Sequence, residues 1–312
     1  MKHKIHQVLD PSHKHWVQGG VFGDLREVSN EFFHKPRFLP PPNSPINIVF
    51  WIYQCFLISM RGKILFSSIT PLINYTKFPL RFRNQSIALW FTHSDHEFDN
   101  LENKSIRSCK IIFIHSLDNA PQFKNLINVK IVPILAAIKP ERFPRMAEIG
   151  NKVLWVGTCV ERKRPDLFLN IVELNPTIQF RLIGKGWENS NYWKRVVDLP
   201  NLEYIEFAGP LSSNLIDGCS IYLMTSQIEG GPMPLIESLA AGLYPICTNT
   251  GFVTDVFNLV GLPLNFIDRN PINISHEISK VNISYQERLR IRNLILTYDF
   301  HRLADLIESA FL

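Results

Sequence analysis

The chain has few cysteines, and they are spread along its length. Its 312 residues include five, namely Cys55, Cys109, Cys159, Cys219 and Cys247, and no two of them form a Cys-x-x-Cys pair. Zinc sites and disulfide frameworks both need cysteines at close, repeated spacings. The scatter therefore argues against both kinds of site and fits a reducing cytosol.

Other features are missing as well. The apolar run Ile46–Met60 is shorter than the about 20 residues that a membrane-spanning helix needs. Residues Met1–Asp10 have no apolar core, so no signal peptide is visible and we expect a cytoplasmic protein. No zinc finger, RNA-recognition signature or arginine-rich arm points to nucleic acid. No Asp-x-Asp metal clamp is evident, so we expect neither a metal nor another cofactor.

Positive charge is concentrated in the first half. Residues 1–150 carry 19 Lys and Arg against 11 Asp and Glu, a net +8, whereas residues 151–312 carry 14 against 17, a net −3. A basic half favours an anionic partner such as a membrane surface, and a solvated surface is the alternative. Lys77–Arg83 mixes cations with apolar residues and is expected to meet a lipid acceptor or an anionic bilayer, with a solvated turn as the alternative. We therefore expect peripheral association with the inner face of a membrane.

The first half alternates short apolar runs with turns and helical segments. This pattern predicts a parallel sheet with covering helices. For Ile46–Met60 a buried helix is the first interpretation and a membrane-associated helix the second. The expected strands are Ile5–Leu9, Ile64–Ile69, Ile87–Thr92, Lys110–His115 and Val129–Val132, and the expected helices are Asp24–Phe33, Ile46–Met60 and Phe98–Ser108.

A second series of the same kind begins at Val153, after a proline-containing connection at Pro133–Gly150. The sequence therefore predicts an α/β fold with two Rossmann-like domains, residues 1–145 and 146–312. The chain is helical again from Ser284 and ends in an amphipathic stripe. The expected strands are Val153–Val156, Gln179–Ile183, Leu202–Phe207, Ile221–Met224 and Tyr244–Thr248, with helices at Pro165–Glu173 and Pro234–Ala241.

The stretch Glu229–Gly242, E-G-G-P-M-P-L-I-E-S-L-A-A-G, follows the expected strand Ile221–Met224. Two glycines and a proline break the apolar pattern, which resumes at helical spacing from Pro234. A helix N-terminus offers unpaired N–H groups and a positive dipole end to an anionic ligand. Glu229 on the loop and Glu237 on the helix can accept hydrogen bonds from ligand hydroxyls. The stretch indicates a nucleotide-sugar site, and an ordinary α/β turn that binds nothing is the alternative.

Three cations, Arg162, Lys163 and Arg164, follow the expected strand Val153–Val156 and lead into the helix Pro165–Glu173. Cations at the carboxyl end of a strand are suited to clamp a diphosphate. A solvated loop is the alternative.

The stretch around Glu229 and Glu237 resembles the Glu-x7-Glu motif of retaining GT-B glycosyltransferases of the group 1, or family 4, type. The likeness is strong over Val153–Asp255 and weaker elsewhere. It implies that Glu229 contacts the donor sugar and Glu237 the ribose, and that Lys163 contacts the donor phosphates. Thr158 stands where the family has an arginine, and Arg162 or Arg164 could compensate.

The resemblance also assigns residues outside the motif. Gly19 and Gly20 resemble the glycine-rich first loop that faces the donor diphosphate, with a simple turn as the alternative. His93 matches the place where the family often has a histidine contacting the donor sugar. The remaining donor-binding candidates are Gly184, Ser226, Gly230 and Gly231.

The family implies a GT-B arrangement with a donor site in a cleft between the domains, and a last helix that returns to the first domain. It implies transfer of a hexose-type sugar, with retention, from a nucleoside diphosphate sugar to a hydroxyl of a glycan or lipid-linked acceptor. Two alternatives remain open. One is a non-catalytic nucleotide-sugar-binding partner protein, and the other is a sugar-nucleotide epimerase on the same scaffold.

Overall fold

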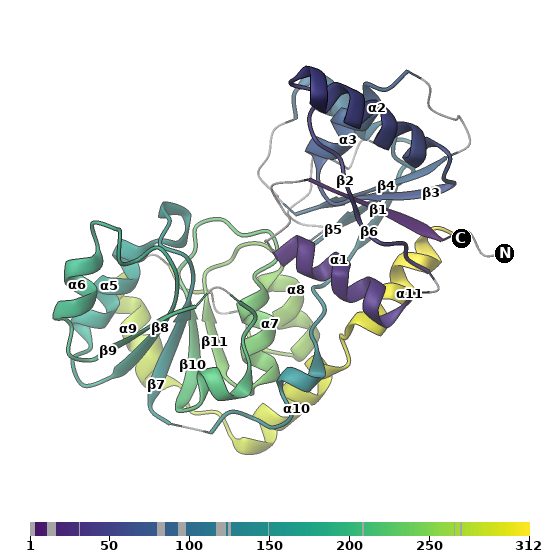
Figure 1. Ribbon diagram of the computed structural model, residues 1–312. Coiled ribbons are helices and arrows are strands. Elements are labelled where there is room, and N and C mark those ends of the chain that lie inside the picture. Colours follow the sequence, from purple (N-terminus) through teal and green to yellow (C-terminus); the bar gives the residue numbers. More distant parts are fainter. Residues whose placement is uncertain are drawn as a thin grey trace. The chain divides into compact units, whose positions relative to one another are not determined.

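The computed structural model describes residues 4–10, 17–30, 32–79, 85–92, 98–116, 123, 126–148, 150–207, 209–264, 266–268 and 270–312. The chain divides into two compact units, one made of Met1–Ala137 with Asp299–Leu312 and the other of Ile138–Tyr298. Each unit has its own parallel sheet (Figure 1). The predicted ranges were 1–145 and 146–312.

The first unit contains a six-stranded sheet in the order β2-β1-β3-β4-β5-β6, and every pairing is parallel. The chain moves outward from β1 to β2 and then crosses back to β3 on the other side of β1. This reversal is the mark of a doubly wound sheet. The strands are β1 (Ile5–Leu9), β2 (Arg37–Phe38), β3 (Lys63–Phe66), β4 (Ser86–Phe91), β5 (Ile111–Ile114) and β6 (Lys130–Pro133).

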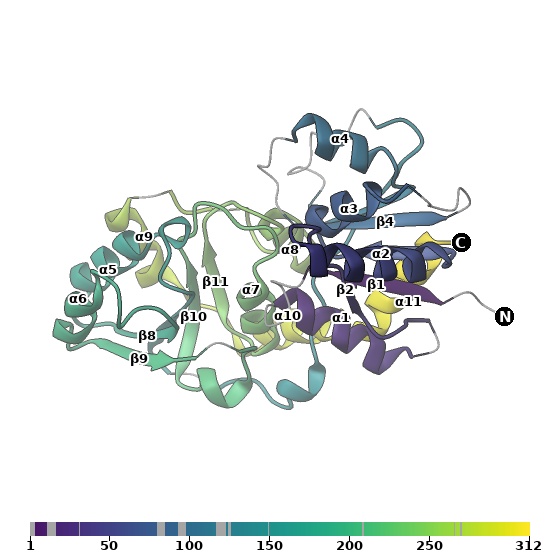
Figure 2. The same cartoon turned by 45° about the horizontal axis from the view of Figure 1, so that its top comes forward.

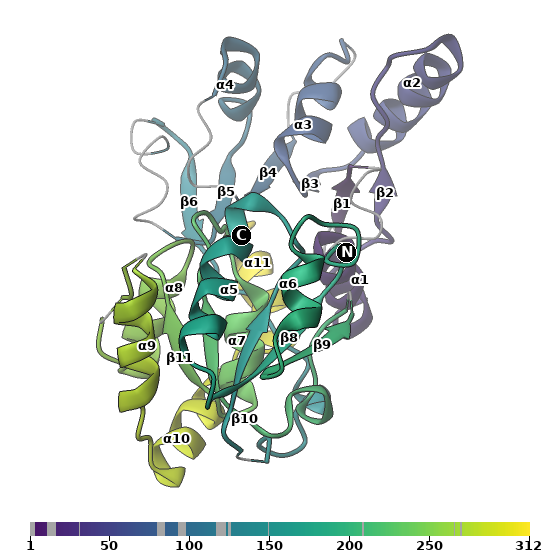
Figure 3. The same ribbon diagram turned by 90° about the vertical axis from the view of Figure 1, so that its left-hand side faces the viewer.

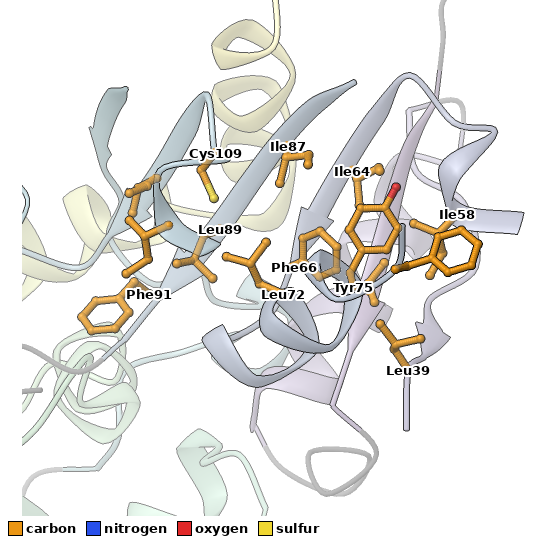
Figure 4. Close-up of a cluster of buried hydrophobic side chains, with 14 of the residues drawn as sticks. Leu39, Ile58, Ile64, Phe66, Leu72, Tyr75, Ile87, Leu89, Phe91 and Cys109 are labelled. Atoms are coloured by element: carbon orange, nitrogen blue, oxygen red, sulfur yellow. The ribbon is translucent and has the colours of Figure 1, made fainter. Parts of the chain in front are cut away.

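Helices cover both faces of this sheet. Helices α1 (Val17–Val28) and α11 (Phe300–Ala310) pack against each other and share one apolar core. Helices α2 (Pro45–Ser59), α3 (Ile69–Thr76) and α4 (Asn100–Ile106) supply the other core. Figure 4 shows this second core, in which side chains of β3 and β4 meet Leu72 and Tyr75 of α3. The last helix of the chain therefore belongs to the first unit.

The second unit contains a five-stranded parallel sheet in the order β11-β10-β7-β8-β9. Helices α5 (Pro165–Leu174) and α9 (Pro271–Lys280) pack together, and α7 (Met233–Ala240) packs against α10 (Tyr285–Leu296). Figures 2 and 3 show these two groups with the strands between them. The strands are β7 (Lys152–Val156), β8 (Gln179–Gly184), β9 (Leu202–Glu206), β10 (Cys219–Met224) and β11 (Tyr244–Cys247), and α6 (Trp193–Asp198) and α8 (Val253–Val260) complete the helices.

Several helices begin with a residue pattern that satisfies their free N–H groups. Ser44 caps α2 by accepting a hydrogen bond from the Asn47 N–H, and Pro45 follows it. Asp99 and Glu102 form a capping box at the start of α4. Ser284 and Asp299 cap α10 and α11 in the same way as Ser44. These local signals fix the residue at which each of the four helices begins.

The predicted α/β fold with two Rossmann-like units is confirmed, and the predicted strands agree with the observed ones to within a few residues. Four helices, α3, α6, α8 and α9, were not predicted. The predicted strand Ile64–Ile69 ends at Phe66, and Ile69 begins α3 instead. Pro71 lies in the first turn of that helix, where its missing N–H costs nothing.

Two further predictions in the first unit need correction. Gly19 and Gly20 lie inside α1 rather than in a loop before it, so they form no glycine-rich loop. The predicted buried helix Ile46–Met60 is a helix, but only one of its faces is buried. Among the described residues, no helix is long and apolar enough to cross a membrane.

Candidate functional site

The strand order of the second sheet identifies the edge where a ligand would bind. The chain runs from β7 through β8 to β9 and then returns to place β10 on the other side of β7. In doubly wound sheets, ligands bind beyond the carboxyl ends of the strands at such a reversal. The loops that follow β7 and β10 are therefore the candidate site. They contain the predicted cations and Glu229.

Hydrogen bonds join these two loops. The indole N–H of Trp155 donates to the Thr225 hydroxyl (3.0 Å), and that hydroxyl donates to the carbonyl of Lys163 (2.9 Å). The N–H of Gln227 donates to the carbonyl of Arg162 (2.7 Å). Trp155 and Thr225 are both buried. The backbone that carries Arg162 and Lys163 is thereby fixed against the backbone that leads to Glu229.

Glu229 is the centre of a charged cluster. Its side chain is 8% exposed, and its Oε1 forms an ion pair with the Nζ of Lys163, which is itself 11% exposed. Its Oε2 lies 3.2 Å from Nη1 of Arg162, whose side chain is 48% exposed. Arg162 also donates to the carbonyl of Ile228 (3.2 Å). A buried carboxylate thus holds one buried and one solvent-facing cation in place.

The loop after β11 supports Glu229 from the other side. The Glu229 N–H donates to the Thr250 hydroxyl (2.9 Å), and the Thr248 hydroxyl donates to the carbonyl of Ser226 (2.6 Å). Gly251 has φ +60°, and a Cβ there would lie 2.5 Å from the carbonyl oxygen of Gly230. Only glycine fits this close approach of two backbones. Three loops therefore hold the carboxylate in position.

Glu237 lies on α7 and is buried, with 4% of its surface exposed. Its Oε1 accepts a hydrogen bond from the Leu211 N–H (3.2 Å). Burial raises the pKa of Glu237 to about 8, against the weaker opposing effects of the Leu211 N–H and the Arg142 charge. Near neutral pH this carboxyl therefore holds a proton. It can donate as well as accept a hydrogen bond.

The third cation of the predicted cluster is directed elsewhere. Arg164 has φ +56° and forms a two-pronged contact with Asp166, with Nε–Oδ1 3.0 Å and Nη2–Oδ2 2.9 Å. The Arg164 guanidinium lowers the pKa of Asp166 below its usual value. Of the three cations, Arg162 and Lys163 pair with Glu229, and Arg164 pairs with Asp166 at the start of α5.

The other predicted donor-binding residues of this unit lie around the same edge. Gly184 ends β8, and a Cβ there would lie 1.9 Å from the carbonyl oxygen of Gly157, so its small size allows two loops to touch. Thr158 is exposed in the loop after β7, and Ser226 is buried after β10. Gly230 and Gly231 are half-buried between Glu229 and α7.

Two sets of predicted residues fall outside this arrangement. His93 lies outside the described residues, and Gly19 and Gly20 belong to α1 of the first unit. Among the described residues, no group of three or more His, Cys, Asp or Glu could hold a metal ion. Thr225 and Thr250 were not predicted as site residues. Hydroxyls at the ends of two neighbouring strands were the signal that could have found them.

The segment that carries this site is similar to a known family. Residues 140–292 match the family model described as glycosyl transferases group 1, and these residues include both glutamates and all three cations. These residues are therefore similar to the domain that defines group 1 glycosyltransferases. The predicted likeness to group 1 glycosyltransferases is confirmed over these residues.

Two Escherichia coli relatives are similar to the chain. They are the O-antigen biosynthesis glycosyltransferase WbnH and the probable O-antigen biosynthesis glycosyltransferase WbiN. Each is 21% identical over 200 residues, which cover 64% of this chain and 52% of the relative. The chain therefore spans about half the length of these relatives.

Solved structures share the fold over the whole chain. Anabaena Alr3699/HepE, solved in complex with UDP and glucose, has a TM-score of 0.72 at 10% identity and covers 99% of both chains. A glycosyltransferase from Rickettsia africae also has a TM-score of 0.72, at 14% identity, with 99% of both chains covered. At these identities the likeness shows the fold alone.

Proposed function

We propose that this protein transfers a hexose-type sugar from a nucleoside diphosphate sugar to an acceptor hydroxyl, with retention of anomeric configuration. One observation carries the proposal. Glu229, Lys163 and Arg162 form a single charged cluster at the reversal point of the second sheet, inside the segment that matches group 1 glycosyltransferases. The acceptor we propose is a glycan or a lipid-linked sugar.

Lys163 and Arg162 are the groups we assign to the leaving diphosphate. Bond cleavage leaves negative charge on the diphosphate, and fixed cations stabilise that charge more than they stabilise the intact donor. Lys163 is already oriented by Glu229, and Arg162 combines an exposed side chain with the same anchor. Arg162 therefore supplies the positive charge that the family's arginine provides and that Thr158 lacks. Arg164 does not, because Asp166 holds it.

The two glutamates have separate roles in this proposal. Glu229 accepts hydrogen bonds from hydroxyls of the donor sugar once the diphosphate takes over its cations. Glu237 binds the ribose, and its protonated carboxyl can donate to one ribose oxygen while accepting from another. His93 remains a predicted contact to the donor sugar. No nucleophilic role is assigned to Glu229.

The donor we would test first is UDP-glucose. The basis is similarity alone, since Alr3699/HepE has been solved with UDP-glucose and shares the fold of this chain. The O-antigen relatives favour a sugar acceptor of surface-polysaccharide assembly. NMR of the product's anomeric proton distinguishes retention from inversion.

The test is hydrolysis of UDP-sugars in the absence of acceptor. Its rate is measured as the release of UDP. We expect Glu229→Gln and Lys163→Met each to lower the rate by about 10²-fold, the typical cost of removing one fixed charge-stabilising group. The matched controls are Lys152→Met and Glu203→Gln, which break an exposed Lys–Glu pair (2.7 Å) at the amino edge of the same sheet. Both controls should keep the wild-type rate.

Two results would contradict the proposal. One is a Lys163→Met protein that is folded, by circular dichroism, and hydrolyses donor at the wild-type rate. The other is a wild-type protein that binds UDP-sugars and never turns them over with any sugar acceptor. The second result would favour a nucleotide-sugar-binding partner protein.

A further inference from the structure

Helix α2 has an unusual surface. None of its 15 residues, PINIVFWIYQCFLIS, carries a charge. One side, formed by Trp51, Gln54, Cys55 and Ile58, is buried in the core of the first unit. Figure 1 shows α2 at the outside of that unit, on the same side of the sheet as α3. Its opposite side faces away from the core.

That outer side is a continuous apolar stripe. Ile46 is 83% exposed, Val49 70%, Tyr53 57%, Phe56 47% and Met60 50%. Their spacings of 3, 4, 3 and 4 place them on one face of a helix. Ile48, Phe50 and Ile52 are also exposed and widen the stripe. We call Ile46, Val49, Tyr53, Phe56 and Met60 the α2 stripe.

The stripe is too concentrated to be ordinary surface. Among the described residues, eight of the seventeen exposed large apolar side chains lie in residues 46–60, whereas single exposed apolar residues are scattered over most proteins. A helix at the surface of a soluble domain normally turns polar residues outward. A helix that is apolar on both sides is in contact with something on both sides. A second layer is therefore expected over the α2 stripe.

The sequence on either side of this helix is basic. Residues 32–94 contain seven Lys and Arg and no Asp or Glu; the seven are Lys35, Arg37, Arg61, Lys63, Lys77, Arg81 and Arg83. Arg37 donates to Gln54 of α2 (3.2 Å), and Arg61 directly follows the α2 C-cap. Lys77 is exposed and precedes Phe78, whose ring packs edge-on against Trp51 of α2 (5.9 Å). Cations therefore lie beside and behind the α2 stripe.

This charge distinguishes the candidate partners. If a second copy of the chain covered the stripe, Arg37, Arg61 and Lys77 of one copy would face the same cations of the other, and like charges disfavour such a contact. An anionic bilayer offers both an apolar interior and negative headgroups. At about 1.5 Å per residue, α2 is about 22 Å long, shorter than the about 30 Å hydrocarbon layer, so it would lie in the interface rather than span it.

We propose that α2 lies flat in the surface of an anionic membrane, with the α2 stripe among the acyl chains and Arg37, Arg61 and Lys77 at the headgroups. The proposal rests on the first unit and does not depend on the donor site. The sequence indicated only that the basic first half contacts a membrane. The present proposal assigns that contact to one face of helix α2.

The test is flotation of the full chain with vesicles of phosphatidylcholine containing 30 mol% phosphatidylglycerol, and with vesicles of phosphatidylcholine alone. We expect binding to the anionic vesicles at low salt and at least tenfold weaker partitioning to the neutral ones. The triple variant Ile46→Ser, Val49→Ser, Tyr53→Ser should bind the anionic vesicles at least tenfold more weakly than wild type. Raising the salt should weaken the wild-type binding, because the headgroup attraction is screened.

The second unit supplies a matched control. Ile272, Val197 and Tyr285 are 66%, 63% and 57% exposed, so the variant Ile272→Ser, Val197→Ser, Tyr285→Ser removes the same three side chains from a similarly exposed setting. It should bind as wild type does. If the α2 triple variant does not fold, the single variant Val49→Glu puts a carboxylate on the stripe and should weaken binding in the same direction.

Three outcomes would overturn the proposal. The first is wild-type-like vesicle binding by the α2 triple variant, and the second is no binding by the wild type at low salt. The third is a wild-type dimer, seen by light scattering without lipid, that the α2 triple variant dissociates, which would make a second copy the occupant. Hydrolysis of UDP-sugar in free solution should be unchanged in the α2 triple variant, so failure here is distinguishable from failure of the proposed function.

Discussion

At the scale of single residues, the proposed binding of a donor begins from the ion pair between Glu229 and Lys163. Both side chains are buried, and Lys163 depends on Glu229 for its counter-charge, whereas Glu229 also pairs with Arg162. A diphosphate can replace the carboxylate as the partner of Lys163. Binding of the nucleotide and release of Glu229 toward the sugar are then one event.

Glu229→Gln tests this exchange. Loss of the carboxylate leaves Lys163 buried without its counter-ion, and we expect about 3 kcal/mol less stability in the free protein. UDP should then raise the melting temperature of the variant more than that of wild type, because the diphosphate restores the missing negative charge. Thermal unfolding with and without UDP measures both effects. A variant that has lost UDP binding altogether would contradict the exchange.

Glu237 predicts a pH dependence of stability. Its pKa is raised from 4.5 to about 8 in the folded protein, so the unfolded state releases this proton first. The contribution is fully present below pH 4.5 and is lost as the pH rises through about 8. At about 1.4 kcal/mol for each pKa unit, the loss is on the order of several kcal/mol. Glu237→Gln should remove this pH-dependent loss of stability. The variant should therefore be more stable than wild type at pH 9.

Urea unfolding at pH 5, 7 and 9 measures this effect. Glu203→Gln is the control, because the pKa of Glu203 is lowered by its contacts with Lys152 and Arg181 although its partial burial opposes them. That variant should give no gain in stability at pH 9. A Glu237→Gln protein whose stability falls between pH 5 and 9 as steeply as that of wild type would show that another group is responsible.

At the scale of elements, the site depends on how closely the loops after β10 and β11 approach each other. Gly251 is the contact point, with its φ of +60° and no room for a Cβ against the Gly230 carbonyl. We expect Gly251→Ala to cost about 1–3 kcal/mol, since it adds both a strained backbone and a clash. Because that clash moves the backbone of Glu229, hydrolysis of UDP-sugar should fall as well.

Gly23→Ala is the matched control for this substitution. Gly23 lies inside α1 of the first unit, and nothing lies within 4 Å of where its Cβ would be. Alanine is favoured over glycine in a helix by up to about 1 kcal/mol, so this variant should be slightly more stable. The melting temperatures of the two variants distinguish a specific effect of the loop contact at Gly251 from a general effect of replacing glycine by alanine. A Gly251→Ala protein as stable as Gly23→Ala would mean that the two loops are not in fixed contact.

The elements also show what the sequence could predict. The strands were predictable because they are short apolar runs ended by glycine or polar residues, as in Val153–Val156 before Gly157. Helix α9 was missed although Asn270 and Pro271 form a clear start signal, because its few apolar residues give weak periodicity. The sequence could not show that one side of α2 is exposed. An apolar helix gives the same sequence pattern whether it is buried in a core or lies in a membrane.

In the candidate site too, the sequence could predict some residues and contacts and not others. Glu229, Glu237 and Lys163 were predictable because a resemblance in spacing marks them. The pairing of Arg162 with Glu229 and of Arg164 with Asp166 was not, because adjacent residues in a tight turn point in directions that spacing does not encode. The supporting hydroxyls of Thr225 and Thr250 depend on which strands are neighbours, and that order appears only in the folded sheet.

At the scale of the whole molecule, the chain ends in the unit where it began. Residues 299–312 belong to the first unit, and Ile307 of α11 is fully buried in the core shared with α1. Ile307→Ala should cost about 2–5 kcal/mol and increase amide exchange in the first unit. Ile278→Ala on α9 is the counterpart in the second unit and should increase exchange there. Equal effects of Ile307→Ala on both units would contradict this division.

The nucleotide-sugar site itself is best tested by thermal unfolding of the wild-type chain against a panel of nucleoside diphosphates and their sugars. A ligand that binds only the folded state raises the melting temperature by mass action. If Glu229, Lys163 and Arg162 form the donor site, one base with one sugar should raise it, and Lys163→Met should lose most of that rise. No rise with any member of the panel at millimolar concentration would contradict a donor site at this edge of the second sheet.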